Sequence, residues 1–281
     1  MGTIGVLNPG SMGISLAVSV KATGHDVCWA SAGRSEQTRS RAEEHGLTEV
    51  GSVEELCQQV EGIVCICPPH ATEQVAREVA GFGFTGVYLD ANAISPARAQ
   101  AIAATVAEVG GRYVDGGVIG SPAWKANSTY LHLSGEEAEV VADWFRDGLL
   151  VINVLGTGAS EASALKMCFA AYTKGTTALF YAILATAERF QVRDALIEQW
   201  SQLAGMVDMA ERAGKSVGGM TTKAWRWIDE MEQISQTFEA AGLHGGFHAA
   251  AAEVFRRSAP LRDIADPEVG EVLQALLAND R

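Results

Sequence analysis

Along the first half of the chain, short apolar runs alternate with longer segments in which apolar residues recur at helical spacing. The apolar runs predict strands at Thr3–Leu7, Asp26–Ala30, Gly62–Cys67, Gly86–Leu89 and Arg112–Val118. The segments between them predict helices, among them Ser11–Ala22, Glu36–His45 and Ala71–Ala80. Because strands and helices alternate at this rhythm, we expect βαβ crossovers and a mostly parallel sheet.

The pattern changes after the glycine turn at Gly156–Gly158. Before it, the runs Thr129–Ser134 and Leu149–Val154 predict two further strands, with a helix at Glu136–Phe145 between them. From Ala159 onward the composition is helical, with short glycine-containing joints. We therefore predict an α/β fold: a Rossmann-type domain over residues 1–157, followed by an all-helical domain over residues 158–281.

Charge and composition narrow the classes of partner. The formal net charge of −13 over 281 residues argues against sequence-independent binding to nucleic acid or to an anionic membrane. No apolar run reaches the ~18 residues of a membrane span, and the N-terminus does not resemble a signal peptide. The five cysteines lack metal-ligand spacing and predict free thiols in a reducing compartment. We expect a cytoplasmic protein that acts on a small molecule and uses no metal.

The first predicted turn carries a motif for a dinucleotide. It lies between a strand and a helix and reads Asn8, Pro9, Gly10, Ser11, Met12 and Gly13. A pyrophosphate loop needs a first residue that tolerates positive φ, a second that lets the ligand approach, and a third that lets the helix pack closely. Asn8 tolerates the left-handed region, and Gly10 and Gly13 keep the other two roles. A chance polar turn is the alternative, and the place on the first βαβ unit favours the dinucleotide.

The end of the second predicted strand bears on which dinucleotide binds. An NAD site usually has an acidic residue there, whereas this chain has Ser31, Arg34 and Ser35 before the first acid, Glu36. Serine hydroxyls and an arginine suit the 2′-phosphate of NADP, so we predict NADP in preference to NAD. Glu36 is the counter-argument, unless it simply begins a helix. Cys67 and Pro68 are expected to border the coenzyme, with a plain strand end as the alternative.

Four segments point to one family. They are the loop with Met12, the run Asp90–Pro96 (DANAISP), the run Asp115–Pro122 (DGGVIGSP), and Gly158 followed by Lys166. Together they resemble the β-hydroxyacid dehydrogenase superfamily, which includes 3-hydroxyisobutyrate and 6-phosphogluconate dehydrogenases, over most of the chain. The resemblance implies that Asn92 lies near the nicotinamide, that Asp115–Pro122 binds substrate, and that Lys166 is the catalytic lysine. The stretch Trp225–Glu232 is similar to a phosphogluconate-dehydrogenase-like subgroup with its own C-terminal domain.

The sequence also departs from the family pattern. Ala170 stands where the family has asparagine, Ile119 where it has a serine, and Asp229 where it has a second lysine. The segment Asp115–Pro122 is similar to imine reductases as well, a sister group that acts on C=N bonds. Two alternatives to a hydroxy-acid dehydrogenase therefore stay open: an imine reductase, and a non-catalytic NADP-binding protein.

The expected reaction assigns a role to Lys166. Hydride transfer to a carbonyl builds negative charge on oxygen, so the protein must deliver a proton or a positive charge there. Lys166 lies on one helical stripe with Ser163, Ala170 and Thr173, among apolar neighbours that would lower its pKa. A lysine that extends to solvent from a buried stem is the alternative.

The substrate's polar end would meet residues on the first domain and on this helix. We predict that Gly120, Ser121, Pro122 and Thr173 bind it, with an ordinary strand-to-loop turn as the alternative for the first three.

The helical half offers weaker signals. His244 and His248 have i, i+4 spacing, but glycines lie between them and no carboxylate is in register, so we do not expect a metal. Asp229, Glu230 and Glu232 either line a site for a cationic substrate or, as we favour, form a solvated face. Lys174 is expected to be structural. The apolar content of this half and the family resemblance both predict a homodimer formed through the helical domain.

Overall fold

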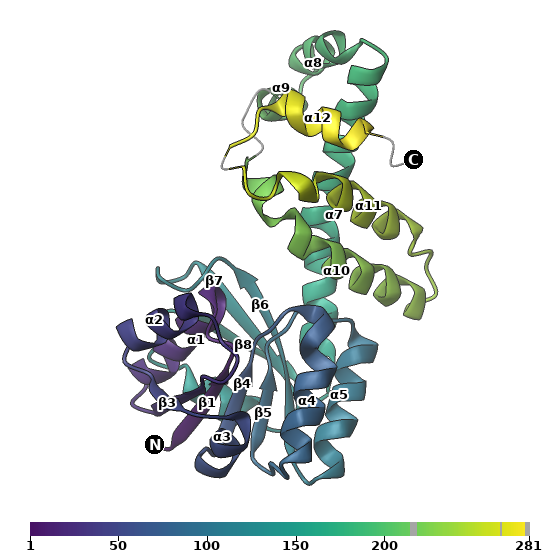
Figure 1. The fold of residues 1–281 in the computed structure, drawn as a ribbon. Coiled ribbons are helices and arrows are strands. Elements are labelled where there is room, and N and C mark those ends of the chain that lie inside the picture. The colour runs from purple at the N-terminus through teal and green to yellow at the C-terminus, as the bar shows by residue number, and fades with distance from the viewer. Residues whose placement is uncertain (214–217, 265, 279–281) are drawn as a thin grey trace. The chain divides into compact units, whose positions relative to one another are not determined.

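The computed structural model describes residues 1–213, 218–264 and 266–278. The chain forms two compact units, Met1–Met167 and Cys168–Arg281 (Figure 1). The division between them falls inside helix α7 (Glu161–Arg189). The boundary predicted at residue 157 falls in the turn before this helix.

The first unit contains one eight-stranded sheet in the order β3-β2-β1-β4-β5-β6-β7-β8. The strands are β1 (Thr3–Leu7), β2 (Asp26–Ala30), β3 (Thr48–Val50), β4 (Gly62–Cys65), β5 (Val87–Asp90), β6 (Arg112–Gly120), β7 (Thr129–Ser134) and β8 (Val151–Gly156). Neighbouring strands are parallel except β6 and β7, which pair antiparallel. The predicted Rossmann-type α/β fold is therefore confirmed.

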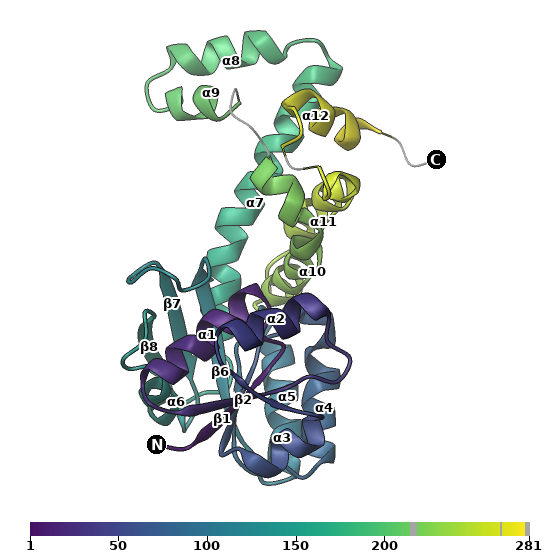
Figure 2. The same cartoon turned by 60° about the vertical axis from the view of Figure 1, so that its left-hand side comes forward.

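Helices cover both faces of the sheet (Figure 2). One face packs against α1 (Ser11–Ala22), α2 (Glu36–Glu44) and α6 (Ala138–Trp144). The other packs against α3 (Val53–Gln59), α4 (Thr72–Gly81) and α5 (Pro96–Glu108), with the short 3₁₀ helix η1 (Pro69–Ala71) before α4. Since both faces are covered, the central strands are buried throughout, which is why they read as unbroken apolar runs.

Two elements were not predicted, and some strand ends differ. Strand β3 has only three residues, two of them exposed. The helix α3 that follows has seven residues, of which only Leu56 is buried. Both are therefore too short and too exposed to give a strong apolar pattern. Strand β4 ends at Cys65, two residues earlier than predicted. Strand β6 continues to Gly120, because its last residue still pairs with Thr129 of β7.

The second unit is helical throughout its described residues, as predicted. It contains most of α7, then α8 (Arg193–Gln202), α9 (Val207–Ala213), α10 (Gly218–Ala240), α11 (Gly246–Ser258), η2 (Ala259–Leu261) and α12 (Val269–Leu277). Helices α10 and α11 lie side by side, joined by a short turn (Figures 1 and 2), and Trp227 meets Phe255 edge-on, with ring centroids 5.2 Å apart. No helix in the described ranges combines the length and the apolarity needed to cross a membrane.

Candidate coenzyme and active site

The first turn of the sheet has the shape of a phosphate loop. Asn8 has a φ of 65°, the left-handed conformation that we expected of it. A Cβ on Gly13 would lie 2.5 Å from the Asn8 carbonyl oxygen and 2.8 Å from Ile66 Cγ2, so only glycine lets α1 pack here. A Cβ on Gly10 would meet nothing closer than 3.9 Å. Gly10 therefore faces open space, which leaves room for a ligand against the backbone.

The N-terminus of α1 fits a pyrophosphate. No side chain of the described residues caps it, and its first turn contains no acid. The helix dipole and the free N–H groups at such an end attract a negative group. Asn8 Oδ1 is buried and has no hydrogen-bond partner in the part of the chain that the structure describes, so it can accept a hydrogen bond from a bound molecule. The loop residues thus fit a dinucleotide on structural grounds.

The predicted 2′-phosphate residues lie on the loop between β2 and α2. Ser31 is buried, and its carbonyl accepts hydrogen bonds from the Arg34 N–H (3.1 Å) and from Arg39 Nη2 (2.9 Å). Ser35 caps α2 by accepting a hydrogen bond from the Thr38 N–H at 3.3 Å. Arg34 Nε is buried and has no hydrogen-bond partner among the described residues. Glu36 lies in the first turn of α2. This position agrees with the alternative that Glu36 begins a helix, rather than binding the ribose of NAD.

Asn92 joins the loops that follow β4 and β5. Its Oδ1 accepts a hydrogen bond from the Cys67 N–H at 2.5 Å, and its Nδ2 donates to Asp90 Oδ1 at 2.5 Å. The side chain of Asn92 is buried, so it fixes the segment Cys67–Pro68 relative to β5. The neighbouring Cys65 thiol and burial raise the pKa of Cys67, and the positive charge of Arg34 opposes this. Arg34 and Cys67, predicted separately as coenzyme residues, are thus near enough to interact electrostatically.

Asp90 is a buried carboxyl group beneath these loops. Burial raises its pKa to about 7, and the hydrogen bonds from Asn92 oppose this shift. A carboxyl group with this pKa changes charge in the physiological range. No local sequence pattern indicated the raised pKa of Asp90, because it results from burial by the surrounding strands.

A second buried carboxylate, Asp115 on β6, holds the first turn of α7. Its Oδ2 accepts a hydrogen bond from the Ser163 N–H (2.7 Å) and its Oδ1 accepts one from the Ser163 hydroxyl (2.6 Å). Ser134 of β7 donates to Asp115 at 3.3 Å and accepts from the Ala162 N–H at 3.1 Å. Side chains of two strands therefore satisfy N–H groups that a helix start leaves without partners. Sequence reasoning placed Asp115 in the substrate segment and missed this role.

Lys166 lies one turn further along α7 and contacts the same strand. Its Nζ donates a hydrogen bond to the Val118 carbonyl at 2.8 Å. A Cβ on Gly117 would lie 2.7 Å from the Ala162 carbonyl oxygen and 3.3 Å from Lys166 Cβ. Gly117 therefore allows α7 to approach β6 closely. Within the run Asp115–Val118, the aspartate thus caps α7, Gly117 lets α7 approach β6, and the Val118 carbonyl binds Lys166.

The predicted substrate residues begin where β6 ends. Gly120 has a φ of 126°, and a Cβ there would lie 2.5 Å from the Ser128 carbonyl oxygen. Ser121 is exposed, and its carbonyl accepts a hydrogen bond from the Thr129 hydroxyl at 2.5 Å. Pro122 follows, and its carbonyl accepts from the Trp124 N–H at 2.8 Å. Lys166 and this segment are thus brought to one strand, whereas Thr173 lies in the second unit, exposed, with its hydroxyl bonded to the Phe169 carbonyl.

In the second unit, the structure divides the acidic cluster. Glu230 is buried and forms an ion pair with Lys174, with the charged atoms 2.5 Å apart. Lys174 Nζ also lies 5.9 Å from the centroid of the Trp227 ring. Glu232 is about half exposed and pairs with Arg256 at 3.0 Å. The solvated-face interpretation is therefore wrong for Glu230, which is buried and paired with Lys174 of helix α7.

Two parts of the chain match known protein families. Residues 2–144, about half of the chain, match the NAD binding domain of 6-phosphogluconate dehydrogenase. The chain belongs to this family. Residues 187–258 match a domain of unknown function, DUF1932, in agreement with the predicted separate C-terminal domain. The resemblance to the β-hydroxyacid dehydrogenase superfamily is confirmed, and the matched domain is an NAD-binding domain.

Individual relatives are distant. An uncharacterized 28.5 kDa protein of Methanothermus fervidus is 27% identical over 173 residues, which cover 62% of this chain and 66% of that protein. A 3-hydroxyisobutyrate dehydrogenase of Mycobacterium tuberculosis has a TM-score of 0.69 at 19% identity, over 99% of this chain and 100% of its own. A reductive aminase of Aspergillus terreus, in complex with NADPH and ethyl levulinate, has a TM-score of 0.57 at 15% identity, over 98% and 99%. At these identities the two structures establish the fold alone.

Proposed function

We propose that this protein is an NADP-dependent oxidoreductase that transfers a hydride between the nicotinamide and a small hydroxy acid or alcohol. The observation that carries the proposal is the placement of Lys166, whose ammonium group is bound to the Val118 carbonyl on the strand that ends in Gly120. This contact supports a role for Lys166 as proton donor to a substrate bound by that segment.

The chemistry follows from the charge that develops in the substrate. In the reductive direction, NADPH, when bound, would supply a hydride to the carbonyl carbon. The C=O π electrons move to oxygen, and the Lys166 ammonium group donates a proton to it, so that an alcohol and a neutral lysine result. In the oxidative direction, neutral Lys166 accepts the hydroxyl proton. Gly120 and Ser121 offer backbone N–H groups and a hydroxyl to the substrate's polar end.

The preference for NADP rests on the loop after β2. Arg34, with a buried Nε that lacks a hydrogen-bond partner among the described residues, can bind a phosphate by charge-assisted hydrogen bonds. Ser31 and Ser35 lie on the same loop, and their hydroxyls are further candidate donors to the phosphate. The reductive aminase with a similar fold was solved with NADPH, which supports the proposal.

Turnover assays test the proton-donor role. NADPH oxidation and NADP reduction would be followed by absorbance against panels of hydroxy acids, their keto acids, aldehydes and ketones. For the substrate found, Lys166→Met should lower kcat by about 10²–10⁴-fold. Lys166→Arg is the matched control: it keeps the charge but does not release a proton, so we expect it to be nearly as inactive. Full turnover by a folded Lys166→Met variant would disprove the role.

An imine reductase is the second candidate. Ala170, buried on α7, stands one turn after Lys166 where the dehydrogenases have asparagine, and reductive aminases, by their name, form C–N bonds. Turnover of cyclic imines, or of a ketone with an amine, without turnover of hydroxy acids would favour this candidate. Tight NADPH binding with no turnover of either panel would instead indicate a non-catalytic NADP-binding protein.

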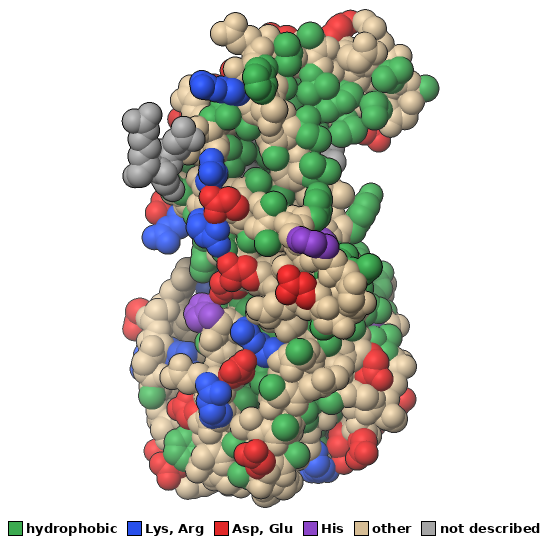
Figure 3. All heavy atoms as spheres, turned by 90° about the vertical axis from the view of Figure 1, so that its right-hand side faces the viewer, with side chains coloured by type: hydrophobic (Ala, Val, Ile, Leu, Met, Phe, Trp, Pro, Cys, Tyr) green, Lys and Arg blue, Asp and Glu red, His purple; other side chains and the backbone are tan. Residues whose placement is uncertain are grey.

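We also propose that the protein works as a homodimer formed through its helical unit, in the cytoplasm, where its free cysteines stay reduced. Helix α7, helix α8 and the turn between them expose apolar side chains around a groove of about 440 Å³, including Leu179 of α7 (44% exposed) and, in the turn, Phe190 (72%) and Val192 (49%). Figure 3 shows hydrophobic side chains gathered on the helical unit. Light scattering should give twice the mass of one chain, and Leu179→Glu should reduce it to one. A monomeric wild type would overturn the proposal.

A further inference from the structure

The arginines of the first unit differ in whether a carboxylate neutralises them. Most are paired: Arg39 with Glu49, Arg77 and Arg98 with Glu73, Arg112 with Glu137, and Arg146 with Asp143 and Asp147. Within residues 1–167, all of which are described, only Arg34 and Arg41 have no carboxylate partner. The chain has a net charge of −13, so carboxylates are abundant. Two guanidinium groups without a carboxylate partner in one region therefore indicate a binding site for an anion.

Arg41 reaches the phosphate loop from α2. Its Nη1 donates to the Pro9 carbonyl at 3.4 Å, which is the only hydrogen bond of its side chain within the described chain. An arginine has five N–H donors, and a single long hydrogen bond leaves most of them free for a ligand. Both Arg34 and Arg41 come from the segment that follows β2, and Arg41 is held against the loop in which Gly10 faces open space.

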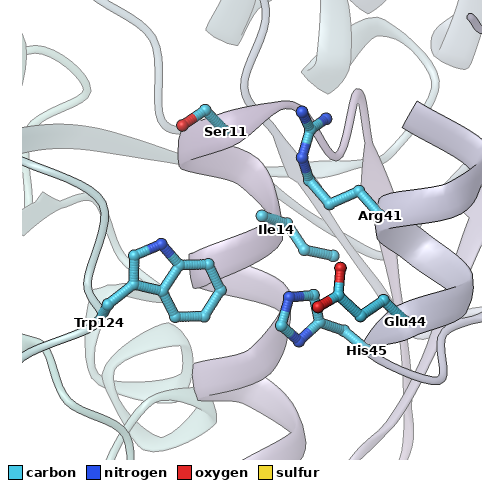
Figure 4. Close-up of a pocket in the computed structure, with 6 residues that line it drawn as sticks. All are labelled: Ser11, Ile14, Arg41, Glu44, His45 and Trp124. Carbon is cyan, nitrogen blue, oxygen red and sulfur yellow. The ribbon is translucent and has the colours of Figure 1, made fainter. Parts of the chain in front are cut away.

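A pocket of about 290 Å³ lies beside this guanidinium (Figure 4). Its walls are formed by Ser11, Ile14, Arg41, Glu44, His45 and Trp124. Arg41 extends toward the end of the pocket at which Ser11 begins α1, whereas Glu44 and His45 lie at the other end. The His45 ring stacks on Trp124, with centroids 5.2 Å apart and planes 17° apart. The pocket thus places cationic and hydroxyl donors at one end and an aromatic wall below them.

We propose that Arg41 is a second phosphate-binding arginine of the coenzyme site, and that the pocket between α1 and α2 receives a phosphate group of the dinucleotide. The inference rests on the proposed NADP function. The planar guanidinium can bind two phosphate oxygens at once, and the Ser11 hydroxyl and the uncapped start of α1 supply further donors. The carboxylate of Glu44 repels an anion, which restricts the phosphate to the Arg41 end.

Either phosphate of the coenzyme has this chemistry. The pyrophosphate is common to NADPH and NADH, whereas the 2′-phosphate belongs to NADPH alone. Binding of the two nucleotides to one variant therefore separates the two sources.

The test compares three variants by calorimetry with NADPH and NADH. Arg41→Met keeps the aliphatic stem and removes the charge, and Arg41→Lys keeps the charge without the planar fork. Arg146→Met is the matched control: it loses the same charge from an exposed arginine on the first unit that is paired with Asp143. Thermal unfolding of each variant would show that it is folded.

We expect Arg41→Met to weaken binding about tenfold, as the loss of one charge-assisted phosphate contact implies. We expect Arg41→Lys to bind more weakly than wild type and more tightly than Arg41→Met, and Arg146→Met to match wild type. Equal weakening for both nucleotides would assign the pyrophosphate, and weakening for NADPH alone would assign the 2′-phosphate. Wild-type affinity in a folded Arg41→Met protein would overturn the inference and leave the proposed function intact. A wild type that binds neither nucleotide would overturn both.

Discussion

The carboxylate of Asp115 binds both the backbone N–H and the hydroxyl of Ser163, a residue 48 positions later in the chain, at 2.7 and 2.6 Å. The contact joins β6 to the first turn of α7. Lys166 follows Ser163 by one helical turn and bonds to the Val118 carbonyl of the same strand. The position of the proposed proton donor is therefore determined by a carboxylate that need not touch the substrate.

Removing this carboxylate should cost both stability and activity. Asp115→Ala leaves buried N–H and hydroxyl groups unsatisfied, and we expect a loss of about 2–3 kcal/mol in the free energy of unfolding and a lower kcat. Urea unfolding and steady-state rates would measure the two effects. The control is Ser52→Ala, which removes the exposed cap of α3. It should cost about 1 kcal/mol without changing kcat, and equal effects of the two substitutions on kcat would refute the positioning role.

The close approach of α7 to β6 should not tolerate a methyl group. Gly117→Ala would bring a Cβ to 2.7 Å from the Ala162 carbonyl oxygen, so we predict a loss of roughly 1–3 kcal/mol from overpacking. A matched substitution is Gly81→Ala at the end of α4, where a Cβ would meet nothing within 4 Å. This control should unfold at the wild-type temperature or slightly above. Comparable melting of both variants would show that α7 can shift at no cost.

Stability should depend on pH through Asp90. Its pKa rises from 3.8 to about 7 on folding, so between these values the folded state binds more protons than the unfolded state. The free energy of unfolding therefore falls as pH rises from about 4 to about 7, by at most about 4 kcal/mol for this group, and is level above pH 7. Asp90→Asn should reduce the fall between pH 5.5 and 7.5 in urea unfolding. An unchanged slope would mean that Asp90 is not the titrating group.

The conformation of Asn8 gives a simple test of the phosphate loop. At a φ of 65°, glycine is at least as favourable as asparagine, whereas alanine costs roughly 1–2 kcal/mol. Asn8→Gly should therefore keep wild-type stability and NADPH affinity, and Asn8→Ala should lose part of both. Thermal unfolding and fluorescence titration with NADPH would compare them. If Asn8→Gly loses NADPH affinity while its stability is unchanged, the buried Oδ1 of Asn8 itself binds the coenzyme.

Much of the fold could be predicted because its signals are local. Strands such as Thr3–Leu7 are buried on both sides and read as apolar runs. That Asn8 can replace the usual first glycine of the phosphate loop follows from backbone sterics alone, because asparagine tolerates positive φ. The three residues of β3 gave no such signal, since its first two are exposed.

The site was harder to predict, because its contacts join distant parts of the chain. Asp115 and Ser163 were each noticed, but nothing in their spacing shows that one caps the other. The burial of Glu230 likewise depends on Lys174 from another helix, and the unpaired state of Arg41 becomes visible only when the partners of the other arginines are known.

Nucleotide binding to the purified protein tests, without a guess about substrate, whether the chain has an NADP site of which Arg34 is a part. We predict one NADPH bound per chain, at least ~10-fold tighter than NADH because of the added phosphate contacts. Arg34→Met should remove most of this difference. Binding of neither nucleotide would contradict the account, and equal binding of both, unchanged in Arg34→Met, would contradict the assignment of NADP.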